Sequence, residues 1–319
     1  DSNSDFEEAA FIVDAVRALR REGIGLSNMA LLYRSNAQSR VLEHALFNAG
    51  VPYRVYGGLR FFERQEIKHA LAYLRLVANP DDDGALLRVV NFPTRGIGAR
   101  SLEQLQEIAR QENLSLWRAA QLGRLGGKAG NSITTFTTLI DNLREACNSL
   151  PLPEQIEHML EHSGLIAHYK AEKEGADRLE NLNELINAAA GFVLEQSADQ
   201  TDASPDVLAA FLTHASLEAG EHQAAAGQAA LQLMTVHAAK GLEFHAVFIS
   251  GLEEGLFPHE NAAKERDGLE EERRLMYVAI TRARRRLYLS FADSRMLHGQ
   301  LRYGIASRFL DELPPVLLK

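Results

Sequence analysis

Two short polar segments near the end of the chain carry residues suited to binding phosphate. Residues 236–243, Val-His-Ala-Ala-Lys-Gly-Leu-Glu, follow an apolar run, and His237 and Lys240 can contact a DNA phosphate. Gly241 allows the backbone to approach a phosphate or a sugar closely, and Glu243 can accept from a ribose hydroxyl or reach a water on Mg²⁺. After a strand of a parallel sheet, such a turn faces the ligand crevice at the carboxyl ends of the strands. Taken alone, the segment also fits an ordinary polar turn.

The second segment, residues 277–284, contains Thr281 and Arg282 at the end of a predicted helix. A guanidinium in that position can stabilise charge on a transferring γ-phosphate, as an arginine finger does. The alternative is an arginine whose aliphatic stem covers surface. Tyr277, by itself, is predicted to be a core residue rather than a catalytic one.

Polar groups also follow the short apolar run 29–33. Tyr33 can stack on a base, and Arg34 can pair with a phosphate. For Tyr33, packing in the core is the competing role, and the spacing alone favours it.

A third polar stretch, residues 88–100, contains three arginines and no acidic residue. Gly96-Ile-Gly98 precedes a helix predicted to begin near residue 102, with Ser101 as its N-cap. Backbone N–H groups at such a helix start form a cradle for a phosphate of duplex DNA. A plain turn is the alternative. A second basic cluster comprises Arg282, Arg284, Arg285 and Arg286, and a solvated face is its ordinary explanation.

No phosphate-binding loop of the form G-x-x-x-x-G-K-[ST] occurs in the 319 residues. The nearest approach, Gly-Gly-Lys-Ala at 126–129, has Ala129 in place of the hydroxyl. That stretch is predicted to be a flexible turn between helices.

The overall composition limits the classes of protein to be considered. A net charge of −9 confines nucleic-acid binding to local basic patches. The single Cys147 excludes an internal disulfide framework and a multi-cysteine zinc cluster, so we expect a reducing cytoplasm and assign no metal ligands. The sequence has no apolar run of about 18 residues and does not open like a signal peptide, so neither a membrane span nor secretion is expected.

The elements that position these residues follow from the hydrophobic pattern. Strands are predicted at 29–33, 51–56, 232–236, 246–251 and 286–291, and the α/β part also contains helices at 6–22, 41–48, 66–77 and 270–281. Helical spacing dominates 101–195 and 207–218, and an Ala/Gly/Gln-rich linker is expected at 219–229. The pattern predicts an α/β domain with a parallel sheet, residues 1–99 plus 228–319, interrupted by an all-helical domain at 100–227.

Together these segments resemble the second half of the superfamily 1A DNA helicases of the UvrD/PcrA/Rep group, nearly from end to end. Residues 33–38, 56–68 and 88–98 are similar to successive motifs of that family, and residues 233–244 and 277–284 are similar to its last two motifs. The resemblance implies a RecA-like domain, 2A, interrupted by the helical domain 2B.

The resemblance also implies a role for each matching residue. Tyr33 would stack on adenine, Arg34 and Arg282 would reach the γ-phosphate, and Gly241 and Glu243 would line the ribose and phosphates. Asn91, His237 and Lys240 would follow single-stranded DNA, and Arg95, Gly96 and Gly98 would hold duplex. ATP with Mg²⁺ would bind only when the family's N-terminal half, domains 1A and 1B, supplies the Walker lysine and the acidic residues.

The implied function is that of an ATP-dependent 3′→5′ DNA helicase for repair and replication, inactive as this chain alone. Its expected partners are single-stranded DNA, single–double strand junctions, the N-terminal half, and repair or replication proteins; its expected location is the cytoplasm, at the bacterial nucleoid. The main alternative is a DNA-binding or partner-docking module that never uses ATP, which Arg34, Glu243 and Arg282 argue against. A helicase–nuclease subunit would need a further nuclease domain.

Overall fold

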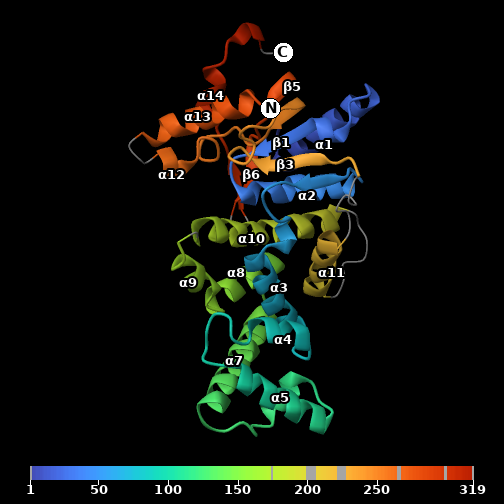
Figure 1. The fold of residues 1–319 in the computed structure, drawn as a ribbon. Coiled ribbons are helices and arrows are strands. Elements are labelled where there is room, and N and C mark those ends of the chain that lie inside the picture. Colours follow the sequence, from blue (N-terminus) through green and yellow to red (C-terminus); the bar gives the residue numbers. More distant parts are fainter. Residues whose placement is uncertain are drawn as a thin grey trace. The chain divides into compact units, whose positions relative to one another are not determined.

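The computed structural model describes residues 2–173, 175–198, 206–220, 228–263, 267–297 and 300–317. Contacts divide the chain into two compact units (Figure 1). The first, Asp1–Phe61 with Glu218–Lys319, is called the sheet unit, and the second, Phe62–Leu217, the helical unit. Each is described by itself.

The sheet unit is built on a five-stranded parallel sheet with strand order β2-β3-β1-β4-β5. The strands are β1 (Met29–Tyr33), β2 (Tyr53–Val55), β3 (Leu231–Thr235), β4 (Phe244–Ile249) and β5 (Ala283–Leu289). Central β1 is buried along its whole length, as expected for a strand covered on both faces. The predicted parallel sheet is therefore confirmed.

Two apolar cores lie on the two faces of this sheet. Successive side chains of a strand point to opposite faces, so Leu31 packs in one core and Leu32 in the other. Helices α1 (Asp5–Arg21) and α2 (Ser39–Asn48) cover the first face. Helices α13 (Gly268–Ile280) and α14 (Arg308–Asp311) cover the second, and α12 (Glu260–Ala263) precedes α13.

A short antiparallel pair near the end of the chain was not predicted. It consists of β6 (Ser294–Leu297) and β7 (Gln300–Tyr303), and β7 is exposed throughout. Arg295 of β6 is anchored by Glu253, with Nε 2.8 Å from Oε2, and by Glu8 of α1. Polar tertiary contacts hold this pair in place, and a hydrophobic pattern does not reveal such contacts.

The helical unit contains the inserted helices (Figure 1). They are α3 (Gln65–Ala78), α4 (Asp83–Val89), α5 (Ala99–Glu112), α6 (Leu116–Gln121), α7 (Gly127–Cys147), α8 (Leu152–His162), α9 (Leu165–Lys170), α10 (Gly175–Ala198) and most of α11 (Val207–Gly220). Short 3₁₀ turns occur at η1 (Leu26–Asn28), η2 (Asn36–Gln38), η3 (Phe61–Glu63) and η4 (Pro315–Leu317). The turn predicted at 126–129 is wrong, because α7 begins at Gly127. Within the described ranges, no helix is long and apolar enough to cross a membrane.

The compact units divide at a different point from the expected domains. The sequence predicted a first border at 99/100, whereas the contacts place it at 61/62. The reason is α3, which packs on α4, α7, α8 and α10 and so joins the helical unit. The return border lies at 217/218. The linker predicted at 219–229 falls largely on residues 221–227, outside the described part of the chain.

Candidate functional site

The loop of residues 236–243 crosses the sheet from one edge to the other. It leaves the carboxyl end of β3 and enters the amino end of β4, and β1 lies between these two parallel strands. Val236 and Ala239 are buried in the core on the α13 face. His237 therefore lies at the carboxyl edge of the sheet, whereas Glu243 lies at the amino edge. The expectation that the segment faces the carboxyl edge therefore holds only for its first part, because a connection between two parallel strands must return to the amino edge.

Arg282 joins this loop to the end of α13. Its Nη1 donates to the carbonyl of Leu242 at 2.8 Å, and its Nε donates to the carbonyl of Val278 at 3.0 Å. Nη2 lies 3.1 Å from Oγ1 of Thr281. A guanidinium has five N–H groups, so these contacts leave two for another acceptor. The side chain is thus held in place and still has N–H groups that can donate to a ligand.

Gly241 and Glu243 lie beside Arg282 at the amino edge. The N–H of Phe244 donates to the Arg282 carbonyl at 2.9 Å, which ties the start of β4 to the start of β5. Glu243 and Gly241 are exposed, and Gly241 has a φ of 85°. That backbone conformation favours glycine. The structure therefore brings together three of the residues assigned to the nucleotide.

Arg34, also assigned to the γ-phosphate, is bound to a buried carboxylate of α13. Its Nη2 lies 2.7 Å from Oε1 of Glu272, and its Nε lies 3.0 Å from both carboxylate oxygens. Glu272 is 1% exposed and also accepts the N–H of His259 at 3.0 Å. This bidentate pair fixes α13 against the end of β1.

Arg34 and Arg282 lie near opposite ends of α13. Glu272, which holds Arg34, is near the start of the helix, whereas Arg282 follows its end at Ile280. The assignment of both guanidinium groups to one γ-phosphate stays a prediction.

Tyr33 takes the competing role that the spacing favoured. Its ring is 0% exposed and packs in the core between the sheet and the helices α1 and α2. A base needs an open ring face to stack upon, and a ring enclosed on all sides has none. The structure places Tyr33 in the core, without an exposed ring face.

Asn91 and Arg95, which were assigned to DNA binding, follow α4 in the helical unit and bond mainly to residues of their own loop. The side-chain oxygen of Asn91 accepts the N–H groups of Arg95 at 2.9 Å and Ile97 at 3.1 Å. Arg95 donates to the carbonyls of Pro93 at 2.9 Å and Ser163 at 2.7 Å. Its guanidinium also lies over two aromatic rings. Both side chains shape the loop from within.

Gly96 and Gly98, by contrast, are exposed. Gly96 has a φ of 76°, and Gly98 is the N-cap of the 14-residue α5 without a side-chain cap. The helix starts at Ala99, so Ser101 lies in its first turn, and the predicted Ser101 cap is wrong. The exposed turn at a helix start is as predicted.

Two features of α13 were missed or misjudged from the sequence. The buried Glu272 shares a helix face with Leu275, Met276 and Ala279, all buried. This spacing predicts that Glu272 is buried with those apolar residues, and a buried carboxylate is normally paired with a cation. Tyr277, predicted to be in the core, is 70% exposed because it lies on the opposite face.

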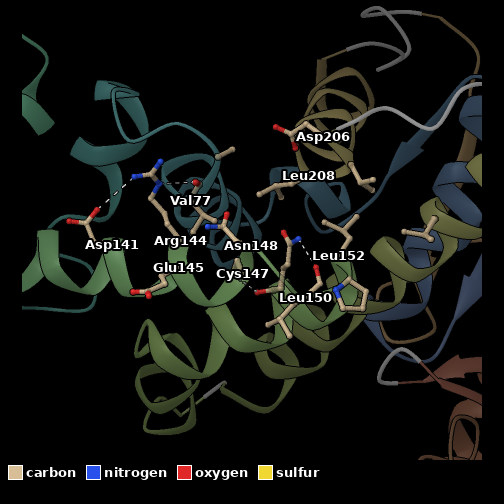
Figure 2. A pocket seen from close by; sticks show the side chains of 15 residues that line it. Val77, Asp141, Arg144, Glu145, Cys147, Asn148, Leu150, Leu152, Asp206 and Leu208 are labelled. Carbon is tan, nitrogen blue, oxygen red and sulfur yellow. Dashed lines mark hydrogen bonds and ion pairs between the residues drawn. The ribbon is translucent and has the colours of Figure 1, made fainter.

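The helical unit also has a pocket of about 800 Å³, away from the assigned residues (Figure 2). Two of its polar side chains bond to main-chain carbonyls: Nε of Arg144 donates to the Val77 carbonyl at 3.2 Å, and Nε2 of Gln155 donates to the Leu150 carbonyl at 2.8 Å. Burial raises the pKa of the Cys147 thiol in its wall, which keeps the thiol protonated and unreactive.

Comparisons with known proteins agree with the resemblance seen in the motifs. The model of the UvrD-like helicase C-terminal domain matches residues 1–294. DNA helicase II of Escherichia coli (strain K12) is 49% identical over 317 residues, which cover 98% of this chain and 44% of that protein. ATP-dependent DNA helicase PcrA of Bacillus subtilis (strain 168) is 42% identical over 330 residues, which cover 99% of this chain and 44% of that protein.

The chain therefore spans less than half the length of these curated relatives. The family match covers the parallel sheet, the crossing loop and the end of α13, where Gly241, Glu243 and Arg282 meet. On the strength of this match and of the fold, the chain belongs to the family of UvrD-like helicase C-terminal domains.

Proposed function

We propose that this chain supplies the C-terminal part of an ATP-dependent DNA helicase that moves 3′→5′ along single-stranded DNA in repair and replication. The observation that carries the proposal is the position of Arg282, bonded to the Leu242 carbonyl between exposed Gly241 and Glu243. The names of two relatives, DNA helicase II and ATP-dependent DNA helicase PcrA, agree with it. The expected location is the cytoplasm, at the nucleoid.

In this proposal the amino edge of the sheet forms one wall of an ATP site. Arg282 uses its remaining N–H groups on the γ-phosphate, where a guanidinium stabilises charge that develops during transfer. Glu243 accepts from a ribose hydroxyl or from a water on Mg²⁺, and Gly241 lets the phosphates approach the backbone. The opposite wall, with the phosphate-binding loop, comes from the N-terminal half of the longer protein.

Arg34 serves the same site in this proposal. Its bidentate bond to Glu272 holds α13 on the sheet, and Arg282 follows the end of that helix. Arg34 contributes to turnover either by reaching the γ-phosphate, as the family resemblance implies, or by positioning Arg282 through the helix, and the KM for ATP of Arg34→Ala distinguishes the two roles.

DNA would be held by two groups of residues. His237 and Lys240 are exposed and would contact phosphates of single-stranded DNA. Asn91 and Arg95 would act by shaping their loop, so that the exposed turn Gly96–Gly98 presents main-chain N–H groups of α5 to duplex phosphate at a junction. Phosphate contacts of this kind are independent of sequence and sensitive to salt.

The test is Arg282→Ala in the full-length protein, assayed for DNA-stimulated ATP hydrolysis. Loss of an arginine finger lowers kcat by roughly 10³–10⁵-fold. Arg286→Ala is the matched control, because Arg286 lies on the same strand end and pairs with Glu22 at 2.6 Å. Near-normal turnover in Arg282→Ala, with normal folding in both variants, would show that Arg282 only covers surface.

A second candidate is an ATP-independent module that binds DNA or docks a partner protein. The absence of a phosphate-binding loop from the 319 residues favours it for this chain by itself. Titration of the chain with single-stranded DNA, with and without ATP and Mg²⁺, gives the discriminating result. The second candidate predicts that the chain binds single-stranded DNA tightly whether or not ATP and Mg²⁺ are present. It also predicts that Arg282→Ala in the full-length protein changes neither DNA affinity nor the rate of ATP hydrolysis.

A further inference from the structure

Strand β5 contains an extra residue between Ala283 and Arg286, close to Arg282. Between the pairs Phe244–Ala283 and Ala246–Arg286, β4 advances by two positions and β5 by three. The β5 residues in this bulge are Arg284 and Arg285. A bulge interrupts the regular alternation of side chains and redirects those it contains, and bulges are over-represented beside active sites.

Both bulged arginines are exposed, and neither has a hydrogen bond or ion pair to any other described residue. Arg286, one residue later, differs: its Nη2 lies 2.6 Å from a carboxylate oxygen of Glu22. The hydrogen bond from Arg286 lowers the pKa of the Glu22 carboxyl. The third arginine of the run is thus engaged within the sheet unit, while the first two present their charge to the surroundings.

The bulge lies at the amino edge of the sheet, beside the residues assigned to ATP. Ala283, which precedes the two arginines, pairs with Phe244, which follows Glu243. The free guanidinium groups are therefore added to a surface that already holds Arg282 and the backbone of Gly241. Guanidinium groups bind phosphate oxygens bidentately, and three of them at one edge match a polyanion.

We propose that Arg284 and Arg285 bind the triphosphate of the nucleotide alongside Arg282. The inference rests on the proposed ATP site and adds two residues to it. They contribute binding energy in the ground state and the transition state alike, because their positions are set by the bulge and not by the reaction. Such uniform binding changes KM and leaves kcat nearly constant.

An edge strand gives a different reason for charged residues. β5 stands at one end of the strand order, and charges and bulges on edge strands prevent pairing with another chain. Edge protection predicts that removal of the arginines causes self-association and has no effect on nucleotide affinity. The two roles are therefore separable by experiment.

The experiment compares Arg284→Ala/Arg285→Ala with Arg286→Ala in the full-length protein at saturating single-stranded DNA. We expect KM for ATP, and the dissociation constant of a non-hydrolysable ATP analogue, to rise about tenfold or more in the double variant. We expect kcat to change by less than about threefold. Arg286→Ala should leave all three near their wild-type values, and Arg284→Lys/Arg285→Lys should recover part of the affinity.

Three results would overturn the inference: an unchanged KM for ATP, a loss confined to DNA affinity and its salt dependence, or aggregation with normal nucleotide binding. Thermal unfolding and light scattering check the state of each variant. Arg282→Ala is measured in parallel. A fall in kcat there with an unchanged KM in the double variant rejects this inference alone, while an unchanged kcat there rejects the proposed ATP site.

Discussion

The side chain of Arg282 donates a hydrogen bond from Nη1 to the main-chain carbonyl of Leu242 at 2.8 Å. Leu242 lies between Gly241 and Glu243, so this bond links the end of α13 to the loop that crosses the sheet. A shift of α13 relative to the strands therefore displaces both the guanidinium and the loop.

Gly241→Ala should strain the loop without causing a clash. Its φ is 85°, yet an added Cβ meets no atom within 4 Å. The left-handed conformation costs a residue with a Cβ about 1–2 kcal/mol, and we expect the free energy of unfolding of the sheet unit to fall by that amount. Chemical denaturation followed by circular dichroism measures it. If the free energies of unfolding of Gly241→Ala and the wild type agree within a few tenths of a kcal/mol, the loop adopts another conformation in solution.

Arg34→Ala should cost far more than the loss of a surface charge. It leaves Glu272, which is 1% exposed, as a buried carboxylate without its guanidinium. Breaking a buried ion pair from one side costs about 3–5 kcal/mol. In the full-length protein, kcat should fall while KM for ATP stays nearly constant.

The matched control for this prediction is the double variant Arg34→Ala/Glu272→Gln. Without the buried charge, it should recover a large part of the lost stability. If the double variant is no more stable than Arg34→Ala, desolvation of Glu272 is not the cause of the loss. A rise in KM for ATP in Arg34→Ala would instead indicate direct contact with the nucleotide.

The two glycines of the predicted duplex contact should behave differently. Gly98 has no atom within 4 Å of an added Cβ and a φ of −85°, so Gly98→Ala meets no clash or strain and should cost only about 0.5–1 kcal/mol, because alanine is a poorer N-cap than glycine. Gly96→Ala, at a φ of 76°, should cost about 1–2 kcal/mol. Trp117, the single tryptophan, is buried in α6 and reports unfolding of the helical unit by fluorescence.

Gly98→Ala is consequently the clean probe of DNA binding. We expect it to weaken binding to junction DNA more than to single-stranded DNA, and to do so equally for different duplex sequences. Equal losses on both kinds of DNA would mean that the turn does not recognise duplex.

The helical unit should lose stability as the pH falls from about 7 to 5, through His69. Burial first, and then the charges of Arg88, His168 and Arg178, lower the pKa of His69 from 6.5 to about 4. The unfolded chain therefore takes up a proton near pH 6.5 that the folded chain refuses until about pH 4. Protonation favours the unfolded state in this window, at a cost of about 2 kcal/mol by pH 5.

His69→Gln keeps a polar group facing the Tyr169 hydroxyl, which lies 2.9 Å from Nδ1 of His69. This variant should remove the extra loss between pH 8 and 5, as measured by urea denaturation with Trp117 fluorescence. Identical pH profiles for the two proteins would show that His69 titrates normally in the folded state.

The sequence alone determined which segments form helices and strands in most of the chain, and which family the chain belongs to. Period-two and helical apolar patterns report which face of a segment is buried, and this is a local property of the chain. The strands β1 and β3 and the helix α13 were predicted within a few residues for that reason. The resemblance of residues 233–244 and 277–284 to two motifs of the family indicated which family the chain belongs to.

Only the tertiary structure decided what each polar side chain touches. Arg34 and Arg282 look alike in the sequence, but the buried Glu272 binds one of them and the carbonyl of Leu242 binds the other. Asn91 satisfies main-chain N–H groups of its own loop, whereas the bulge in β5 leaves two arginines exposed. A hydrogen bond depends on distances between groups that the fold brings together, and residue types along the chain do not contain those distances.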